Sequence, residues 1–82
     1  MKPDQLKSTG FRLKCLREEK ELKQANIANL LKTSQTVYSR YERDERALPL
    51  HHLRTLCQFY DVSADYLLGL IDEPLSYERK EK

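Results

Sequence analysis

The chain has 82 residues, which suits one small domain and excludes two-domain enzymes, barrels and doubly wound sheets. Hydrophobic residues make up 39% and charged residues 34%, and the few glycines and prolines argue against a disordered chain. Two cysteines, Cys15 and Cys57, are too few for a disulfide-stapled scaffold, and no window has the apolar length of a membrane span. We therefore expect a soluble cytoplasmic protein with free thiols, without a metal site or cofactor.

The charge is unevenly distributed along the chain. Residues 1–60 carry twelve Lys and Arg against seven Asp and Glu, a net charge of +5, whereas residues 61–82 carry three against six, a net charge of −3. A basic body with an acidic end suits a negatively charged partner that touches only the body. The alternative is a chance asymmetry on a solvated surface.

Five short helices are predicted in chain order. The first begins at Ser8 or Thr9 and ends near residues 20–21, with apolar positions between polar ones such as Arg12. The second covers residues 24–31, and the third covers residues 35–43 after Ser34, whose hydroxyl suits an N-cap.

The fourth and fifth helices complete the fold. The fourth covers residues 49–60, with Pro49 at its first position and an apolar stripe on one face. The fifth covers residues 64–68, with Ser63 as its N-cap and Gly69 at its end. Because no segment alternates as a strand does, we expect an all-α, compact five-helix bundle.

The third helix has two different faces. Val37, Tyr38 and Tyr41 fall on an apolar side that can pack against the second helix. The opposite arc holds one amide, two hydroxyls and two guanidiniums, in Gln35, Thr36, Ser39, Arg40 and Arg43. Amides and guanidiniums can bond base edges in pairs, and a helix fits the DNA major groove. Taken alone, such a face is more often an ordinary solvent-exposed one than a functional one, and the preceding short helix and turn reverse that balance.

Two runs give the face its context, LKQANIA at residues 22–28 and SQTVYSRYER at residues 34–43. They resemble the helix-turn-helix of the Cro/C1-type (XRE family) transcriptional regulators, and the resemblance continues to VSADYLL at residues 62–68. It covers about residues 10–69 and implies a lambda-repressor-like fold with the helix-turn-helix in the second and third helices. Residues 1–9 then form an N-terminal extension and residues 70–82 a C-terminal tail.

The resemblance also implies roles for individual residues. Gln24 is expected at backbone phosphate, Gln35 and Thr36 at bases, and Arg43 at phosphate again. Ser39 and Arg40, one turn on, are expected to reach bases or phosphate. The full set of predicted DNA-binding residues is Lys23, Gln24, Ser34, Gln35, Thr36, Ser39, Arg40 and Arg43. Arg17 and Glu42 match a structural ion pair that does not read sequence.

Some positions depart from the family pattern. Lys23 stands where Thr is usual, which removes an N-cap and adds a cation near phosphate. Glycines common in the turns are replaced by Glu21, Lys32 and Asp44, so that Lys32 must tolerate or avoid a left-handed conformation. The hydroxyls of Tyr38 and Tyr41 are expected to reach solvent or phosphate.

The sequence therefore predicts a non-enzymatic, sequence-specific double-stranded DNA-binding regulator, a repressor, located with the nucleoid. The alternative is an antitoxin-type module that binds a toxin and its own promoter. Because one recognition helix reads few base pairs, a homodimer is expected. Its surface would come from apolar residues of the fifth helix and its exit, namely Tyr66, Leu67, Leu68, Leu70 and Ile71. Alternatively, these residues all pack on the protein's own core and dimers form only on DNA.

Two other pairs invite a chemical interpretation. Cys57 lies on the apolar stripe of the fourth helix and is expected to be a buried thiol, whereas Cys15 is harder to place. His51 and His52 are neighbours on a helix, so their side chains point about 100° apart and cannot chelate together. We expect both to face solvent.

Overall fold

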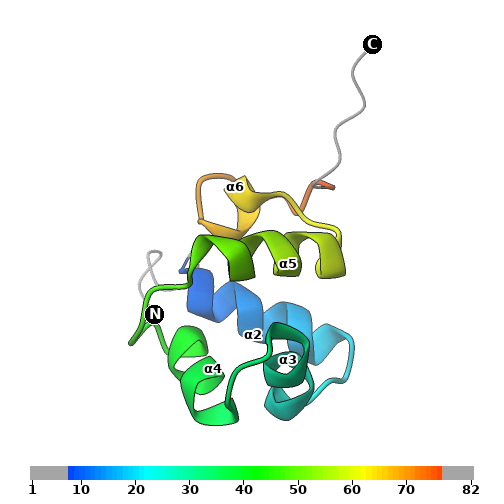
Figure 1. The fold of residues 1–82 in the computed structure, drawn as a ribbon. Helices are drawn as coiled ribbons and strands as arrows, with labels where there is room; N and C mark the ends of the chain where they lie inside the picture. The colour runs from blue at the N-terminus through cyan, green and yellow to red at the C-terminus, as the bar shows by residue number, and fades with distance from the viewer. Residues whose placement is uncertain (1–7, 77–82) are drawn as a thin grey trace.

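The computed structural model describes residues 8–76, and this part of the chain is all-α (Figure 1). Its helices are α2 (Thr9–Glu19), α3 (Gln24–Leu31), α4 (Gln35–Glu42), α5 (Leu50–Tyr60) and α6 (Ala64–Leu67). The sequence predicted all five, α3 with its bounds unchanged and the others within one or two residues. Most of the expected N-terminal extension and the last residues of the tail lie outside the described residues.

Serine side chains begin three of the five helices. Ser8, Ser34 and Ser63 each accept a hydrogen bond from the backbone N–H three residues on, at the starts of α2, α4 and α6. Such a bond satisfies one of the N–H groups that a helix start leaves without an intrahelical partner. α5 begins one residue later than predicted. The ψ of Pro49 is 150°, which is extended, so Pro49 is the N-cap and Leu50 is the first helical residue.

The helices form two groups around α2 (Figure 1). α3 and α4 pack against each other on one side of α2, and α5 and α6 lie on the other, while α2 contacts both α4 and α6. Every helix contributes to one core, whose buried apolar side chains are Leu13, Leu16, Ile27, Ala28, Leu31, Tyr38, Tyr41, Leu53, Leu56, Cys57, Tyr60, Val62 and Leu67. α4 is therefore held by the core on one side and free of it on the other.

Left-handed residues end four of the helices. Glu21, Lys32, Asp44 and Asp61 have φ values of 57°, 58°, 59° and 57°. The first three are the positions at which the family resemblance led us to expect glycine. Lys32 thus adopts the left-handed conformation rather than avoiding it, and the turns keep a geometry that glycine would make without strain.

The start of α2 meets the end of α4 closely. The Gly10 N–H donates to Asp44 Oδ1 at 2.9 Å. A Cβ on Gly10 would lie 2.7 Å from the carbonyl oxygen of Tyr41 and closer still to that of Glu42. Only glycine permits this approach, which fixes the end of α4 against α2.

Arg12 is buried, although the sequence pattern placed it among the polar positions of the first helix. Its guanidinium donates to the carbonyl oxygens of Tyr66 and Ile71 at 3.1 and 2.8 Å, and to Asp72 Oδ1 at 3.0 Å. The same group lies 4.3 Å from the centroid of the Tyr66 ring, a cation–π contact. These bonds anchor the segment after α6 onto α2.

The thiols and imidazoles have different surroundings. Cys57 is buried, as predicted, and burial raises the pKa of its thiol; Cys15 is half-buried, and neither forms a disulfide.

His51 is exposed as expected, but His52 is half-buried, with its ring 6.1 Å from that of Tyr41. Burial, with a contribution from His51, lowers the pKa of His52.

Residues 8–76 contain neither a membrane-spanning helix nor a cluster of metal-binding side chains. No helix there is long and apolar enough to cross a bilayer. No group of three or more His, Cys, Asp or Glu side chains in the same part of the chain is arranged to hold a metal ion.

Candidate nucleic-acid interface

A tight turn joins α3 to α4. Residues 32–34 connect them, with Lys32 left-handed and the Thr33 N–H donating to the carbonyl oxygen of Ala28 at 2.9 Å. Ala28 is buried in the core, and α3 and α4 pack against each other. The arrangement of α3, turn and α4 is that of a helix-turn-helix.

The inward face of α4 is fixed by two tyrosines. Tyr38 and Tyr41 are 0% and 5% exposed, and their rings meet edge to face with centroids 6.2 Å apart. The Tyr38 hydroxyl is buried and has no hydrogen-bond partner among the described residues. The prediction that it reaches solvent or phosphate was therefore wrong, because the whole ring sits in the core; burial also raises its pKa.

The outward face of α4 carries the predicted binding side chains. Gln35, Thr36, Arg40 and Arg43 are exposed, and Ser39 is half-buried. Five of the eight predicted residues line one shallow depression on this side of the molecule: Gln24, Gln35, Thr36, Ser39 and Arg43. Residues from the start of α3 and from α4 therefore share one surface, as joint binding requires.

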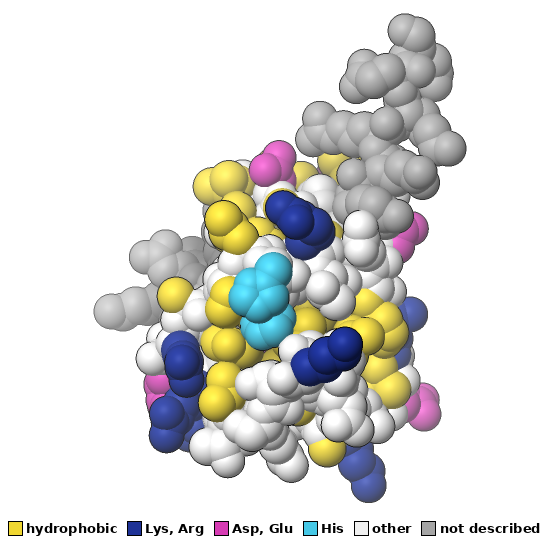
Figure 2. Space-filling view, viewed as in Figure 1, with side chains coloured by type: hydrophobic (Ala, Val, Ile, Leu, Met, Phe, Trp, Pro, Cys, Tyr) yellow, Lys and Arg dark blue, Asp and Glu magenta, His cyan; other side chains and the backbone are white. Residues whose placement is uncertain are grey.

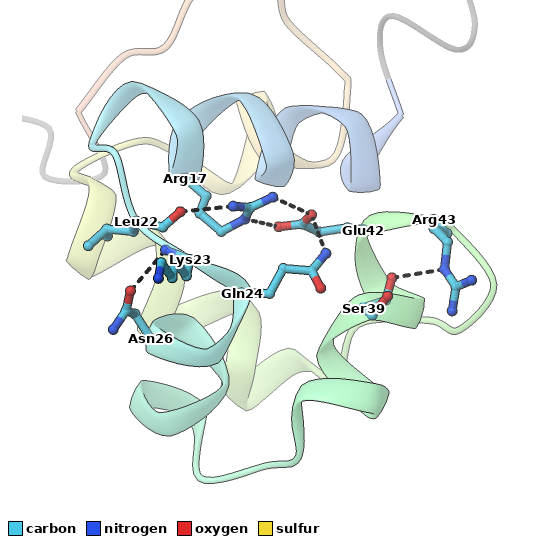
Figure 3. Close-up of polar contacts among 8 residues, drawn as sticks. All are labelled: Arg17, Leu22, Lys23, Gln24, Asn26, Ser39, Glu42 and Arg43. Carbon is cyan, nitrogen blue, oxygen red and sulfur yellow. Dashed lines mark hydrogen bonds and ion pairs between the residues drawn. The ribbon is translucent and has the colours of Figure 1, made fainter.

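The other three predicted residues lie outside that depression. Lys23 and Ser34 are exposed at the starts of α3 and α4, and Arg40 projects into solvent. Lys23 supplies no side-chain cap to α3; instead its backbone N–H donates to Asn26 Oδ1 at 2.8 Å (Figure 3). The ammonium group of Lys23 can only donate hydrogen bonds, so it takes no part in capping the helix.

Arg43 has neighbours that the sequence did not indicate. Its Nε donates to the Ser39 carbonyl oxygen at 3.4 Å (Figure 3), and its Nη2 lies 3.4 Å from a Glu45 carboxylate oxygen. Both Arg43 and Glu45 side chains are more than half exposed, so this ion pair contributes little to stability. A phosphate can compete with Glu45 for the guanidinium.

Arg17 and Glu42 form a buried ion pair behind this surface (Figure 3). Arg17 Nε and Nη2 donate to the two carboxylate oxygens of Glu42 at 2.7 and 3.1 Å, and Nη1 donates to the Leu22 carbonyl oxygen at 2.8 Å. The two side chains are 12% and 3% exposed. The pair joins α2 to the end of α4.

Gln24 adds a third donor to the same carboxylate. Its Nε2 lies 3.0 Å from Glu42 Oε1. Burial alone would raise the pKa of Glu42, but the hydrogen bonds from Arg17 and Gln24 outweigh it, so the pKa of Glu42 is lowered. The nearby Tyr38 hydroxyl reaches no acceptor with hydrogen-bond geometry. Sequence reasoning missed the Gln24–Glu42 bond because the two residues are eighteen positions apart.

Comparison with known proteins agrees with this geometry. A family model described as a helix-turn-helix domain matches residues 10–73. The chain therefore belongs to the XRE-type helix-turn-helix family.

One curated relative comes from Bacillus subtilis (strain 168), the uncharacterized HTH-type transcriptional regulator YobD, which is 38% identical over 63 residues. The match covers 77% of this chain and 56% of that relative, so the chain spans little more than half of the relative's length. No solved structure matches the chain significantly.

Proposed function

We propose that this chain is a sequence-specific double-stranded DNA-binding transcription regulator that acts as a repressor. The observation that carries the proposal is α4, whose apolar face is fixed in the core while its polar face stands exposed. An α-helix fits the major groove, and its side chains can read base edges there. The relative from Bacillus subtilis is itself named an HTH-type transcriptional regulator.

The proposed roles follow from position along α3 and α4. Gln35 and Thr36, in the first turn of α4, read bases, and an amide can bond adenine through two atoms. Ser39 and Arg40, one turn on, contact bases or phosphate. Lys23, Gln24, Ser34 and Arg43 surround it and bind the sugar-phosphate backbone. Phosphate contacts fix the orientation of the protein, and base contacts supply its sequence preference.

The charge distribution supports the same orientation. The acidic residues Asp65, Asp72 and Glu73 belong to α6 and the segment after it. Figure 1 shows α6 on the opposite side of α2 from α4. DNA docked on α4 is therefore kept away from this acidic end.

The binding mode predicts different effects for two substitutions on α4. Gln35→Ala removes a base contact, so the difference in binding free energy between the specific and the random duplex should fall by about 1–3 kcal/mol. Arg43→Ala removes a phosphate contact and should weaken both duplexes alike. Fluorescence titration of each variant against both duplexes measures this. Equal losses on both duplexes from Gln35→Ala would show that Gln35 does not read bases.

We also propose that the protein binds DNA as a homodimer. Of the five apolar residues expected at the dimer surface, Leu67 is fully buried, Tyr66 and Ile71 are half-buried, and Leu68 and Leu70 are 51% and 71% exposed. Leu50, at the start of α5, is 76% exposed and lines one groove together with Leu68. Figure 2 shows apolar side chains gathered over the α6 exit, at the upper left. Such a patch commonly marks a protein contact.

A further inference from the structure

Glu42 organises more than its ion pair with Arg17. Its carboxylate accepts three N–H donors, two from Arg17 and one from Gln24. An ionised carboxylate can only accept, so the Gln24 atom that faces it must be the amide nitrogen and not the oxygen. Figure 3 shows the Gln24 amide oxygen pointing away from Glu42. The chemistry of the partner thus fixes which way this amide is turned.

The fixed amide belongs to the proposed binding surface. Gln24 lines the same depression as Gln35, Thr36, Ser39 and Arg43. With one N–H committed to Glu42, the amide offers the depression its oxygen and one remaining N–H. A glutamine side chain without such a bond samples several rotamers, and binding would have to restrict them. A side chain already held in place avoids part of that entropic cost.

Arg17 holds the carboxylate itself in position. It binds both oxygens of Glu42, and its third donor is occupied by the Leu22 carbonyl oxygen just before α3. Glu42 is therefore fixed between α2 and the start of α3. The orientation of Gln24 therefore depends on Arg17 and Glu42, which are buried. Of the three side chains, Gln24 is the one that lines the surface depression.

We propose that Glu42 is a positioning residue for DNA binding, which orients the Gln24 amide at the duplex. The proposal rests on the proposed function. It differs from a purely structural role for the Arg17–Glu42 pair, because a structural pair would affect DNA binding only through the stability of the fold. The two roles separate in a double-mutant cycle.

The cycle combines Glu42→Gln with Gln24→Ala in the full chain. The probe is a duplex that the wild-type protein selects from a randomised pool. Glu42→Gln should weaken binding about three- to tenfold in the wild-type background, the effect of one hydrogen bond. It should have no further effect once Gln24→Ala has removed the amide. An equal loss in both backgrounds would overturn the proposal.

A second measurement needs neither a variant nor DNA. In NMR spectra of the free protein, the side-chain amide protons of Gln24 should exchange with water more slowly than those of exposed Gln35. Equally fast exchange would overturn the proposal, even where Glu42→Gln fails to fold. If the wild-type protein bound no duplex, the proposed function would fail, while the exchange rates would still decide whether Glu42 holds Gln24.

Leu56→Ala is the matched control for loss of stability. Leu56 is fully buried in the core on α5, outside the DNA-binding depression and the exposed leucines of the proposed dimer surface. This variant should lower stability without changing the Gln24 exchange rate or the duplex affinity. A loss of affinity as large as that of Glu42→Gln would mean that destabilisation alone explains the effect, and would overturn the proposal.

Discussion

At the residue scale, burying the Glu42 carboxylate costs free energy, but the carboxylate also holds the side chains of Arg17 and Gln24 in fixed orientations. Removing a carboxylate from water is expensive, and two partners at 2.7 and 3.0 Å offset that cost. A well-packed apolar side chain could contribute as much stability, but it could not hold a guanidinium and an amide in fixed orientations. We infer that the pair serves the relative placement of α2, α3 and α4 as well as stability.

Removing one partner of this pair should be costly. Arg17→Met leaves a buried carboxylate without its main donor, and Glu42→Gln leaves a buried guanidinium without its counter-charge, so each should lower the free energy of unfolding by about 3–5 kcal/mol. Denaturant unfolding of both single variants and of the double variant gives the coupling energy. A coupling energy near zero would contradict a direct tie between the two side chains.

The same carboxylate predicts a pH dependence. The pKa of Glu42 in the folded protein lies below its ordinary value of 4.5. The stability that the ionised carboxylate contributes is therefore complete above about pH 4.5 and is lost as the pH falls through the lower folded pKa. The pKa of Arg17 is raised, so Arg17 stays charged throughout. Between pH 6 and pH 3, wild type should lose more unfolding free energy than Glu42→Gln. Parallel pH profiles would contradict this assignment.

Single residues also show where sequence reasoning stops. The family resemblance pointed to Arg17 and Glu42 as a pair. Nothing in the helical spacing of Arg12 indicated that it would be buried, because its partners are two carbonyl oxygens and a carboxylate more than fifty positions away. The buried hydroxyl of Tyr38 was missed for a similar reason. A helical wheel shows which side of the helix a residue faces, but not how deeply its side chain is buried.

At the element scale, the helices were predictable and the turns were not. Serine caps and apolar spacing are local signals, so the helix starts after Ser34 and Ser63 could be read directly. The left-handed turn at Lys32 is imposed by the packing of α3 on α4 against the preference of the residue itself. Local propensity does not report such tertiary effects.

The strained turn yields a prediction. Lys32→Gly should raise the unfolding free energy by about 0.5–1 kcal/mol, because glycine adopts a φ of 58° without a Cβ clash. Asn29→Gly, at an exposed position inside α3, is the control and should destabilise, since glycine is the poorer helix former. Thermal unfolding of both variants gives the comparison. Destabilisation by Lys32→Gly would show that the left-handed turn carries no strain.

At the scale of the whole molecule, the two sides of α2 carry different surfaces. On one side α4 exposes its polar face, whereas on the other side the exposed leucines are Leu50 in α5 and Leu68 and Leu70 just after α6. In a dimer with two-fold symmetry, contact through the exposed leucines would set the distance between the two copies of α4. Half-sites about 34 Å apart, one turn of DNA, would place both in the major groove on one side of the duplex.

The dimer surface can be tested directly. Leu68→Lys puts a charge into the exposed apolar patch and should shift the sedimentation of the protein toward the monomer. Leu30→Lys is the control, an exposed leucine on α3 outside that patch, and should leave the oligomeric state unchanged. If wild type sediments as a monomer and a footprint covers a single half-site, the dimer proposal is wrong.

The most direct test of the central claim is titration of duplex DNA with the folded protein at several salt concentrations. Lys23, Arg40 and Arg43 are exposed around the face of α4 that we propose to dock on DNA. Each phosphate that they neutralise releases counterions, so the logarithm of the affinity should fall with the logarithm of the salt concentration, with a slope of about −0.9 per phosphate contact. Substituting Lys23 or Arg43 by Ala should reduce the slope by about one contact. A folded protein that binds no duplex at low salt would contradict the account.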